Sequence, residues 1–131
     1  MDTLPLRLAP GDDLRRTLEA ALGGTGVHAG FVLAGIGSLS RACIRLAGAS
    51  DAPPQDGPFE LLTLAGTIAD GASHLHASLA RSDGTLFGGH VAYGCCVQTT
   101  AEVLVGLLPA WRFSREADQA TGYAELVIRR A

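Results

Sequence analysis

The stretch ASHLHASLARSDGTLFGGHVAYGCCVQ, residues 72–98, decides the fold that we expect for this sequence. Residues 72–81 and 90–98 both have the alternation and the β-branched or apolar content of strands, and the pair Asp83-Gly84 lies between them. Two such runs around an Asp-Gly pair are typical of an antiparallel β-hairpin. The sequence therefore predicts a β-rich domain that contains this hairpin.

The same stretch contains three of the four histidines of the chain. His74 and His76 are two residues apart, and side chains on a strand alternate between its faces, so both imidazoles are expected on one face. Leu75 and Leu79 fall on the opposite face, which predicts that this opposite face packs into the core.

His90 needs an additional feature to join the other two histidines. A simple two-residue turn at Asp83-Gly84 places His90 opposite Ala77, on the core face. A one-residue bulge at Gly88 or Gly89 would shift the register and bring His90 to the histidine face, opposite Ser78 and diagonal to His76. The sequence thus predicts a bulge at one of these glycines.

Three imidazoles that converge in this way can hold one metal ion. Three neutral histidines with a fourth position left open are typical of catalytic zinc, whereas structural zinc usually has four protein ligands. We therefore predict a zinc site at His74, His76 and His90. The alternative is a polar strand face that binds no metal.

Glu102 is the one candidate for a catalytic carboxylate. It lies within the apolar run of residues 101–108. Near the metal it could act as a general acid or orient a ligand, and otherwise it is the exposed residue of an alternating strand. No other motif for nucleophilic, nucleotide or disulfide chemistry is present.

Outward from the hairpin, the sequence predicts one helix and further strands. Asp12 or Asp13 can cap a helix over residues 14–22, in which apolar residues recur at helical spacing, and Gly23-Gly24 ends it. Strands are expected over residues 4–8, 30–39, 41–48, 59–69 and 101–108, and the last of these could also be a helix. Two further strands are expected within 112–130, on both sides of a turn. A loop is expected over 49–58.

Composition excludes several classes of protein. A length of 131 residues suggests a single domain over 1–131, and 47% hydrophobic with only 18% charged residues exclude disorder. The net charge of −3 provides no overall basic field for nucleic acid. No signal peptide or transmembrane helix is expected. The chain has three cysteines, an odd number that does not suggest a disulfide framework. We therefore expect a cytoplasmic protein without a membrane partner.

Five segments, taken in order, resemble the PPC domain (plants and prokaryotes conserved) and cover nearly the whole chain. They are LAPGDDLRRTLEAAL (8–22), FVLAGIGSLSRACIRL (31–46), GPFELLTLAGTI (57–68), HLHASLARSDGTLFGGHV (74–91) and FSREADQATGYAEL (113–126). Each segment alone is weak evidence, but together and in this order they are specific to the family.

The resemblance implies an α+β fold, a mainly antiparallel sheet with one packed N-terminal helix, similar to that of acetolactate decarboxylase. It also implies a homotrimer and a zinc site at the positions of His74, His76 and His90. Plant members join the domain to AT-hook segments that bind DNA, but this chain has no Arg-Gly-Arg-Pro hook and no basic arm.

Three functions follow as expectations. The first is a homotrimeric zinc-binding protein with a small-molecule ligand at the metal or a regulatory role. The second is a zinc-dependent lyase or hydrolase that acts on a small oxo or hydroxy acid. The third is a DNA-associated regulator, whose DNA affinity would depend steeply on salt.

Overall fold

A computed structural model describes all 131 residues as eight strands and one helix. In chain order these are β1 (Asp2–Leu8), α1 (Leu14–Gly23), β2 (Gly30–Arg45), β3 (Pro54–Ile68), β4 (His74–Arg81), β5 (Leu86–Val91), β6 (Cys96–Leu107), β7 (Trp111–Ala117) and β8 (Ala124–Arg130). The predicted class, a mainly antiparallel sheet with one packed helix, is confirmed.

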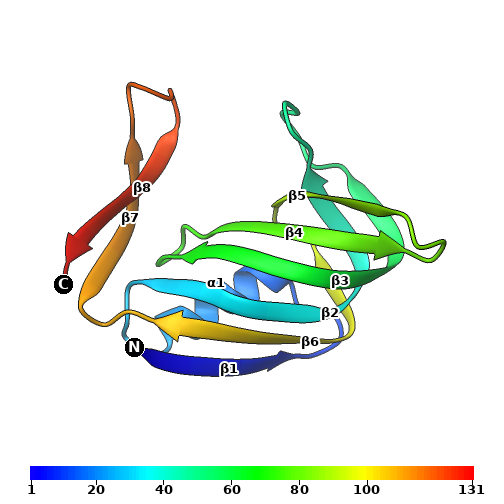
Figure 1. Cartoon of the computed structure of the whole chain (residues 1–131), viewed down its shortest axis with the longest axis horizontal. Helices are drawn as coiled ribbons and strands as arrows, with labels where there is room; N and C mark the ends of the chain where they lie inside the picture. The colour runs from blue at the N-terminus through cyan, green and yellow to red at the C-terminus, as the bar shows by residue number, and fades with distance from the viewer.

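Six strands form one sheet in the order β1-β6-β2-β3-β4-β5 (Figure 1). All of its pairings are antiparallel, and β2 makes an additional pairing with β5 through Ile44 with Val91 and Arg45 with His90. This second pairing requires the sheet to curl, because β2 then contacts β3 along most of its length and β5 near its end. The curl brings the end of β2 beside the predicted histidine hairpin.

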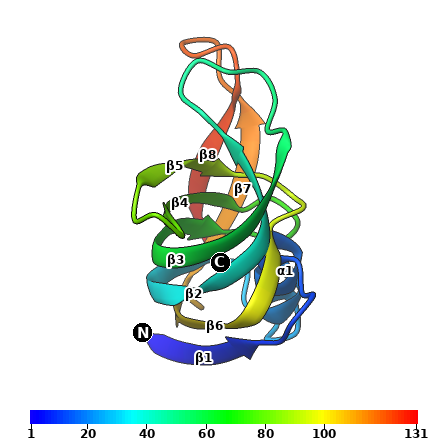
Figure 2. The same cartoon turned by 90° about the vertical axis from the view of Figure 1, so that its right-hand side faces the viewer.

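The helix covers one face of the sheet, as Figure 2 shows from the side. Asp13 caps it, since its carboxylate accepts a hydrogen bond of 2.9 Å from the backbone N–H of Arg16. Its leucines at positions 14, 18 and 22 are buried and join the main core cluster with residues from the sheet. The predicted helix and its N-cap are confirmed. No helix has the length and hydropathy that crossing a membrane requires.

Two predicted strand boundaries were wrong in the long strands. The separate strands expected over 30–39 and 41–48 are one strand, β2, and the predicted break coincides with a register shift between Leu39 and Arg41. The loop expected over 49–58 ends early, because β3 already begins at Pro54. Residues 101–108 are mostly strand, not helix, as part of β6.

The strand expected over 90–98 was also wrong. β5 ends at Val91 and β6 begins at Cys96, so the chain turns in between. Gly94 has φ +105 and donates its N–H to the Asp13 carboxylate at 2.7 Å. A positive φ breaks an extended strand, and the helix cap holds the break in place.

The hairpin of β7 and β8 stands apart from the six-stranded sheet in Figure 1. Phe113 anchors it by packing with Ala29 and Ala69 in a second, small core cluster. Arg115 donates a hydrogen bond of 2.9 Å to Thr67 Oγ1 on β3. This contact brings a guanidinium group from the end of the chain to the strand next to β4.

Candidate metal centre

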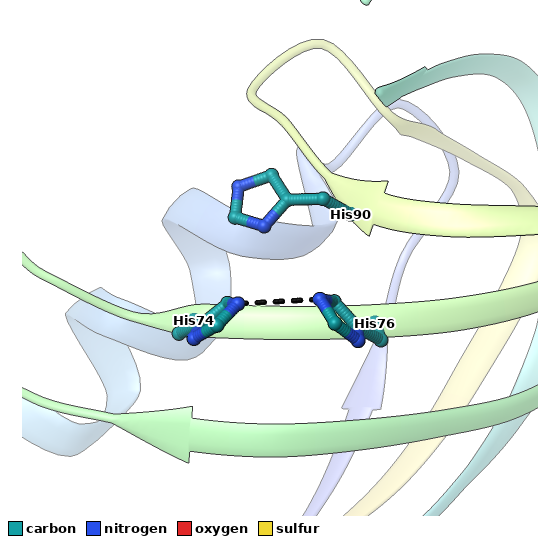
Figure 3. A group of neighbouring side chains, drawn as sticks. All are labelled: His74, His76 and His90. Atoms are coloured by element: carbon teal, nitrogen blue, oxygen red, sulfur yellow. Dashed lines mark hydrogen bonds between the residues drawn. The ribbon is translucent and has the colours of Figure 1, made fainter. Parts of the chain in front are cut away.

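β4 presents two histidines on one face, as their spacing predicts. His74 and His76 pair across the ladder with Thr67 and Ala65 of β3, while Leu75 between them is fully buried. The Nε2 atoms of the two histidines are 3.2 Å apart, and their rings are nearly perpendicular at 84° (Figure 3). The Nε2 edges of the two imidazole rings therefore face each other on the open side of β4.

β5 brings His90 to the same face, but not through the predicted bulge. The pairing of β4 with β5 is regular, and His90 lies directly opposite His76 rather than diagonal to it or opposite Ser78. The register is set in the turn, where Arg81 N–H donates to Thr85 O and Gly84 N–H donates to Arg81 O, both at 2.8 Å. Three residues, 82–84, lie between Arg81 and Thr85, and Gly84 has φ +85. The predicted two-residue turn and the predicted bulge were therefore wrong.

Gly88 and Gly89 have a different role from the predicted one. A side chain at Gly89 would place its Cβ 2.5 Å from the carbonyl oxygen of Arg45 and 3.0 Å from the Ile44 side chain. A Cβ at Gly88 would collide with the backbone oxygen of Ala77. The two glycines therefore let β5 fit closely between β4 on one side and the end of β2 on the other.

The three histidines offer nitrogen atoms that all lie within 4.8 Å of one another. Ligands about 2.0–2.1 Å from a tetrahedral ion are about 3.3–3.4 Å apart, which is close to the separation of the Nε2 atoms of His74 and His76. His90 Nδ1 is buried and has no hydrogen-bond partner in the protein. In Figure 3 this nitrogen faces the gap between the other two rings. A metal ion in that gap would supply the missing partner.

The surroundings keep two of these histidines neutral at pH 7. Burial lowers the pKa of His90 to about 4, and the charges of Arg45, His74 and Arg15 act in the same direction. Burial also lowers the pKa of His74, with Arg115 and His76 adding to the effect and Glu125 opposing it. A neutral imidazole has the free lone pair that metal binding requires, so protons compete weakly at these two positions.

Glu102 is not part of this cluster. It lies on β6 opposite Ile36 of β2, and it lines a hollow of about 400 Å³ together with Glu60 and Thr100. The lining of that hollow includes no histidine. Among the residues predicted as a site, the structure brings the three histidines together and leaves Glu102 elsewhere on the sheet.

Two arginines beside the histidines were missed by the sequence analysis. Arg45 pairs directly with His90 across β2 and β5, and Arg115 contacts Thr67, the cross-strand partner of His74. Both contacts join segments far apart in the chain, and neither has a local sequence signal. Knowledge of the strand order would have been needed to find them.

These observations define a class: a curled antiparallel sheet with one covering helix and a cluster of three histidines on the open face of one hairpin. The comparison with known proteins gives the family. The model of the Plants and Prokaryotes Conserved (PCC) domain, also abbreviated PPC, matches residues 1–109. The chain belongs to this family, and the predicted resemblance is confirmed.

Individual relatives and solved structures agree with this assignment. The chain is 43% identical over 125 residues, 95% of its length, to the bifunctional protein GlmU of a Synechococcus strain. It spans only 20% of the length of that protein. A protein of solved structure from Salmonella enterica is 35% identical, with a TM-score of 0.94 over 98% of this chain and 94% of that one. A metal-containing protein from Archaeoglobus fulgidus is 27% identical, with a TM-score of 0.77 over 97% and 94% of the two chains.

Proposed function

We propose that this protein binds a zinc ion through His74, His76 and His90 and presents the open coordination position of the ion to a small-molecule ligand. The observation that carries the proposal is the unpartnered Nδ1 of His90, which faces the gap between His74 and His76. The Nε2 atoms of His74 and His76 are 3.2 Å apart, close to the separation of two ligands of one zinc ion. Three neutral imidazoles with one position free suit zinc, and a bound zinc would polarise a carbonyl group or activate water. The metal-containing relative from Archaeoglobus fulgidus supports a metal in this fold.

The charges around the site favour an anionic ligand. Arg45 lies beside His90, and Arg115 reaches the strand position opposite His74. Neither guanidinium forms an ion pair with a carboxylate of the protein. A carboxylate or a similar small anion at the metal would therefore have two cationic neighbours. This observation also supports the second candidate, a zinc-dependent lyase or hydrolase of small oxo or hydroxy acids, which turnover of such acids by the zinc-loaded protein would distinguish from simple binding.

We further propose that the protein is a homotrimer, as the family resemblance implies. The sheet face opposite α1 carries several large apolar side chains that are unusually exposed, including Leu33 at 46%, Ile36 at 55% and Leu62 at 41%. Large apolar side chains left exposed on one face of a sheet are typical of an interface. A second and third copy of the chain would cover it.

Metal analysis of the purified protein tests the zinc proposal. We expect about one zinc ion per chain in wild-type protein after dialysis against zinc and then against buffer. The double variant His74→Ala, His76→Ala should retain only background zinc, because a single imidazole cannot hold the ion. His28→Ala is the matched control, since His28 lies outside the cluster, and it should bind as wild type does. Wild-type protein without zinc, or a double variant with undiminished zinc, would contradict the proposal.

A further inference from the structure

Arg15 of α1 contacts the backbone beside two of the histidines from the opposite face of the sheet. Its Nη2 donates to the carbonyl oxygen of Ser73 at 2.8 Å, and its Nε donates to Ser73 Oγ at 3.1 Å. Its Nη1 donates to the carbonyl oxygen of Val91 at 3.4 Å. Ser73 immediately precedes His74, and Val91 immediately follows His90, so one guanidinium group bridges the two histidine-bearing segments.

This bridge lies where the strand ladder no longer connects these segments. The last pair between β4 and β5 is His76 with His90. Beyond it, the chain after β5 turns toward β2, where Ala92 N–H donates to Cys43 O at 3.0 Å. His74 therefore has no ladder partner on the β5 side, and Arg15 is the group that spans the gap.

Glu19 holds Arg15 in place and balances its charge. Its carboxylate lies 3.2 Å from Arg15 Nε, accepts hydrogen bonds from Ser73 N–H and Ser73 Oγ, and accepts one of 2.8 Å from the Tyr93 hydroxyl. The side chains of Arg15 and Glu19 are only 16% and 11% exposed. Burial alone would raise the pKa of Glu19, but the hydrogen bonds from Ser73, Tyr93 and Arg15 lower it, so the carboxylate is ionised at neutral pH.

We infer that Arg15 is a positioning residue of the metal centre: by bridging the carbonyl groups of Ser73 and Val91, it fixes the separation of His74 from His90 from behind the sheet. The effect on metal binding rests on the proposed function, whereas the hydrogen bonds of Arg15 are part of the structure itself. Groups that hydrogen-bond to the ligands of a metal orient them, and their loss typically weakens metal binding about 10–100-fold. Arg15 acts on the backbone beside the ligands, so we expect an effect at the lower end of this range.

Arg16 provides a closely matched control. Both arginines are on α1, and both guanidinium groups lie over the Tyr93 ring, at 4.4 Å for Arg15 and 4.1 Å for Arg16. Only Arg15 bonds to the backbone of Ser73 and Val91. Arg15→Gln and Arg16→Gln therefore remove the same charge and a similar contact with Tyr93, but Arg15→Gln also removes the bridge and the ion pair with Glu19. Arg15→Lys keeps a positive charge beside Glu19 and so separates the loss of the bridge from the loss of that charge.

The first measurement is zinc affinity, by competition with a chromogenic chelator. We expect at least tenfold weaker binding for Arg15→Gln and binding within twofold of wild type for Arg16→Gln. Arg15→Lys, which keeps the charge but cannot form the forked bridge, should weaken binding by an intermediate factor, and it replaces Arg15→Gln if that variant does not fold. Equal affinities for wild type and the Arg15 variants, or an equal loss in Arg16→Gln, would overturn the inference.

The second measurement needs no metal. In zinc-free protein, amide hydrogen exchange over residues 73–76 and 90–93 should accelerate in Arg15→Gln and remain at the wild-type rate in Arg16→Gln. If wild type binds no zinc but this difference is present, the bridge is supported and the proposed function fails. If exchange in these segments does not distinguish the two variants, the inference fails whatever the metal does.

Discussion

At the scale of single residues, His90 combines burial with an unmet bonding requirement. Its Nδ1 is shielded from water and has no partner, and its surroundings include Arg45 and two further histidines. Protonating this ring would add a positive charge where the protein provides no acceptor for it. The neutral ring is therefore the form that the fold stabilises.

This preference predicts an acid sensitivity of the metal-free protein. The pKa of His90 falls from 6.5, its ordinary value, to about 4 in the folded state, so between these values the unfolded chain binds more protons than the folded one. Stability should then decrease as pH falls from about 6.5 to 4, and His90 should have no such effect above that window. The lowered pKa of His74 acts in the same direction.

Thermal unfolding of zinc-free protein between pH 7.5 and 4.5 measures this effect. His90→Gln should show a smaller decrease in Tm over this range than wild type, and His28→Ala should show the wild-type decrease. An equal decrease in His90→Gln and wild type would show that another group is responsible.

The residue-scale predictions from the sequence succeeded where alternation alone decides. The common face of His74 and His76 follows from a spacing of two, and their shared face is what the structure has. The position of His90 depends on the number of residues in the turn. Asp83-Gly84 fits either a two-residue or a three-residue turn, so the register could not be derived from those residues alone.

At the scale of elements, β5 is a short strand between two neighbours. It pairs with β4 over five residue pairs from His76–His90 to Ala80–Leu86, and the end of β2 adjoins it at Ile44 and Arg45. Gly88 and Gly89 leave no side chain between these backbones. The position of His90 thus depends on the close approach of three strands.

Gly89→Ala should therefore disturb both stability and the metal centre. The added methyl group would meet the carbonyl oxygen of Arg45 at 2.5 Å, so β5 must move away from β2. We expect a loss of about 1–3 kcal/mol in the free energy of unfolding, measured in urea, together with weaker zinc binding.

Gly23→Ala is the control for this substitution. Gly23 is the last residue of α1, and a Cβ there would contact nothing within 4 Å. Its free energy of unfolding should be unchanged or higher by up to about 1 kcal/mol. If Gly89→Ala were as stable as Gly23→Ala, the close approach of β5 and β2 would not be a constraint.

Sequence patterns predicted elements best where their signals are local. The capping aspartate and the leucine spacing of α1 are such signals, and so is the turn of the β7–β8 hairpin. The pairing of β2 with β5 joins Arg45 to His90, 45 positions apart, and the hydrogen bond between Asp13 and Gly94 joins residues 81 positions apart. Alternation within a strand does not encode its neighbours, so these contacts could not be predicted.

At the scale of the whole molecule, the sheet has one face covered by α1 and one face left open. Phe31 and Leu104 add to the exposed apolar side chains of the open face. The fold itself could be predicted from the ordered motifs of the family, but this surface required coordinates, because exposure of an apolar side chain depends on what packs over it.

The proposed trimer predicts the effect of a charge on the open face. Wild-type protein should have about three times the chain mass of 13.5 kDa in light scattering. Leu33→Glu should shift the population towards monomer, because the carboxylate would be buried between copies. Leu86→Glu places the same charge at a residue that is 63% exposed at the start of β5, and it should leave the trimer intact.

Two results would contradict the trimer. One is a monomeric wild type at the concentrations of the experiment. The other is a Leu33→Glu variant that remains trimeric, because the interface would then not include the surface around Leu33; dissociation of Leu86→Glu in its place would put the interface at the far end of the β4–β5 hairpin.

All three candidate ligands come from the seventeen residues between His74 and His90, within one hairpin. A slip of one residue in the pairing of β4 with β5 would turn His90 to the opposite side of the sheet and separate it from its two companions. An ion held by the three rings would therefore favour the native alignment over one shifted by a single residue. Binding of the proposed metal ion would then disfavour this one-residue slip in strand pairing during folding.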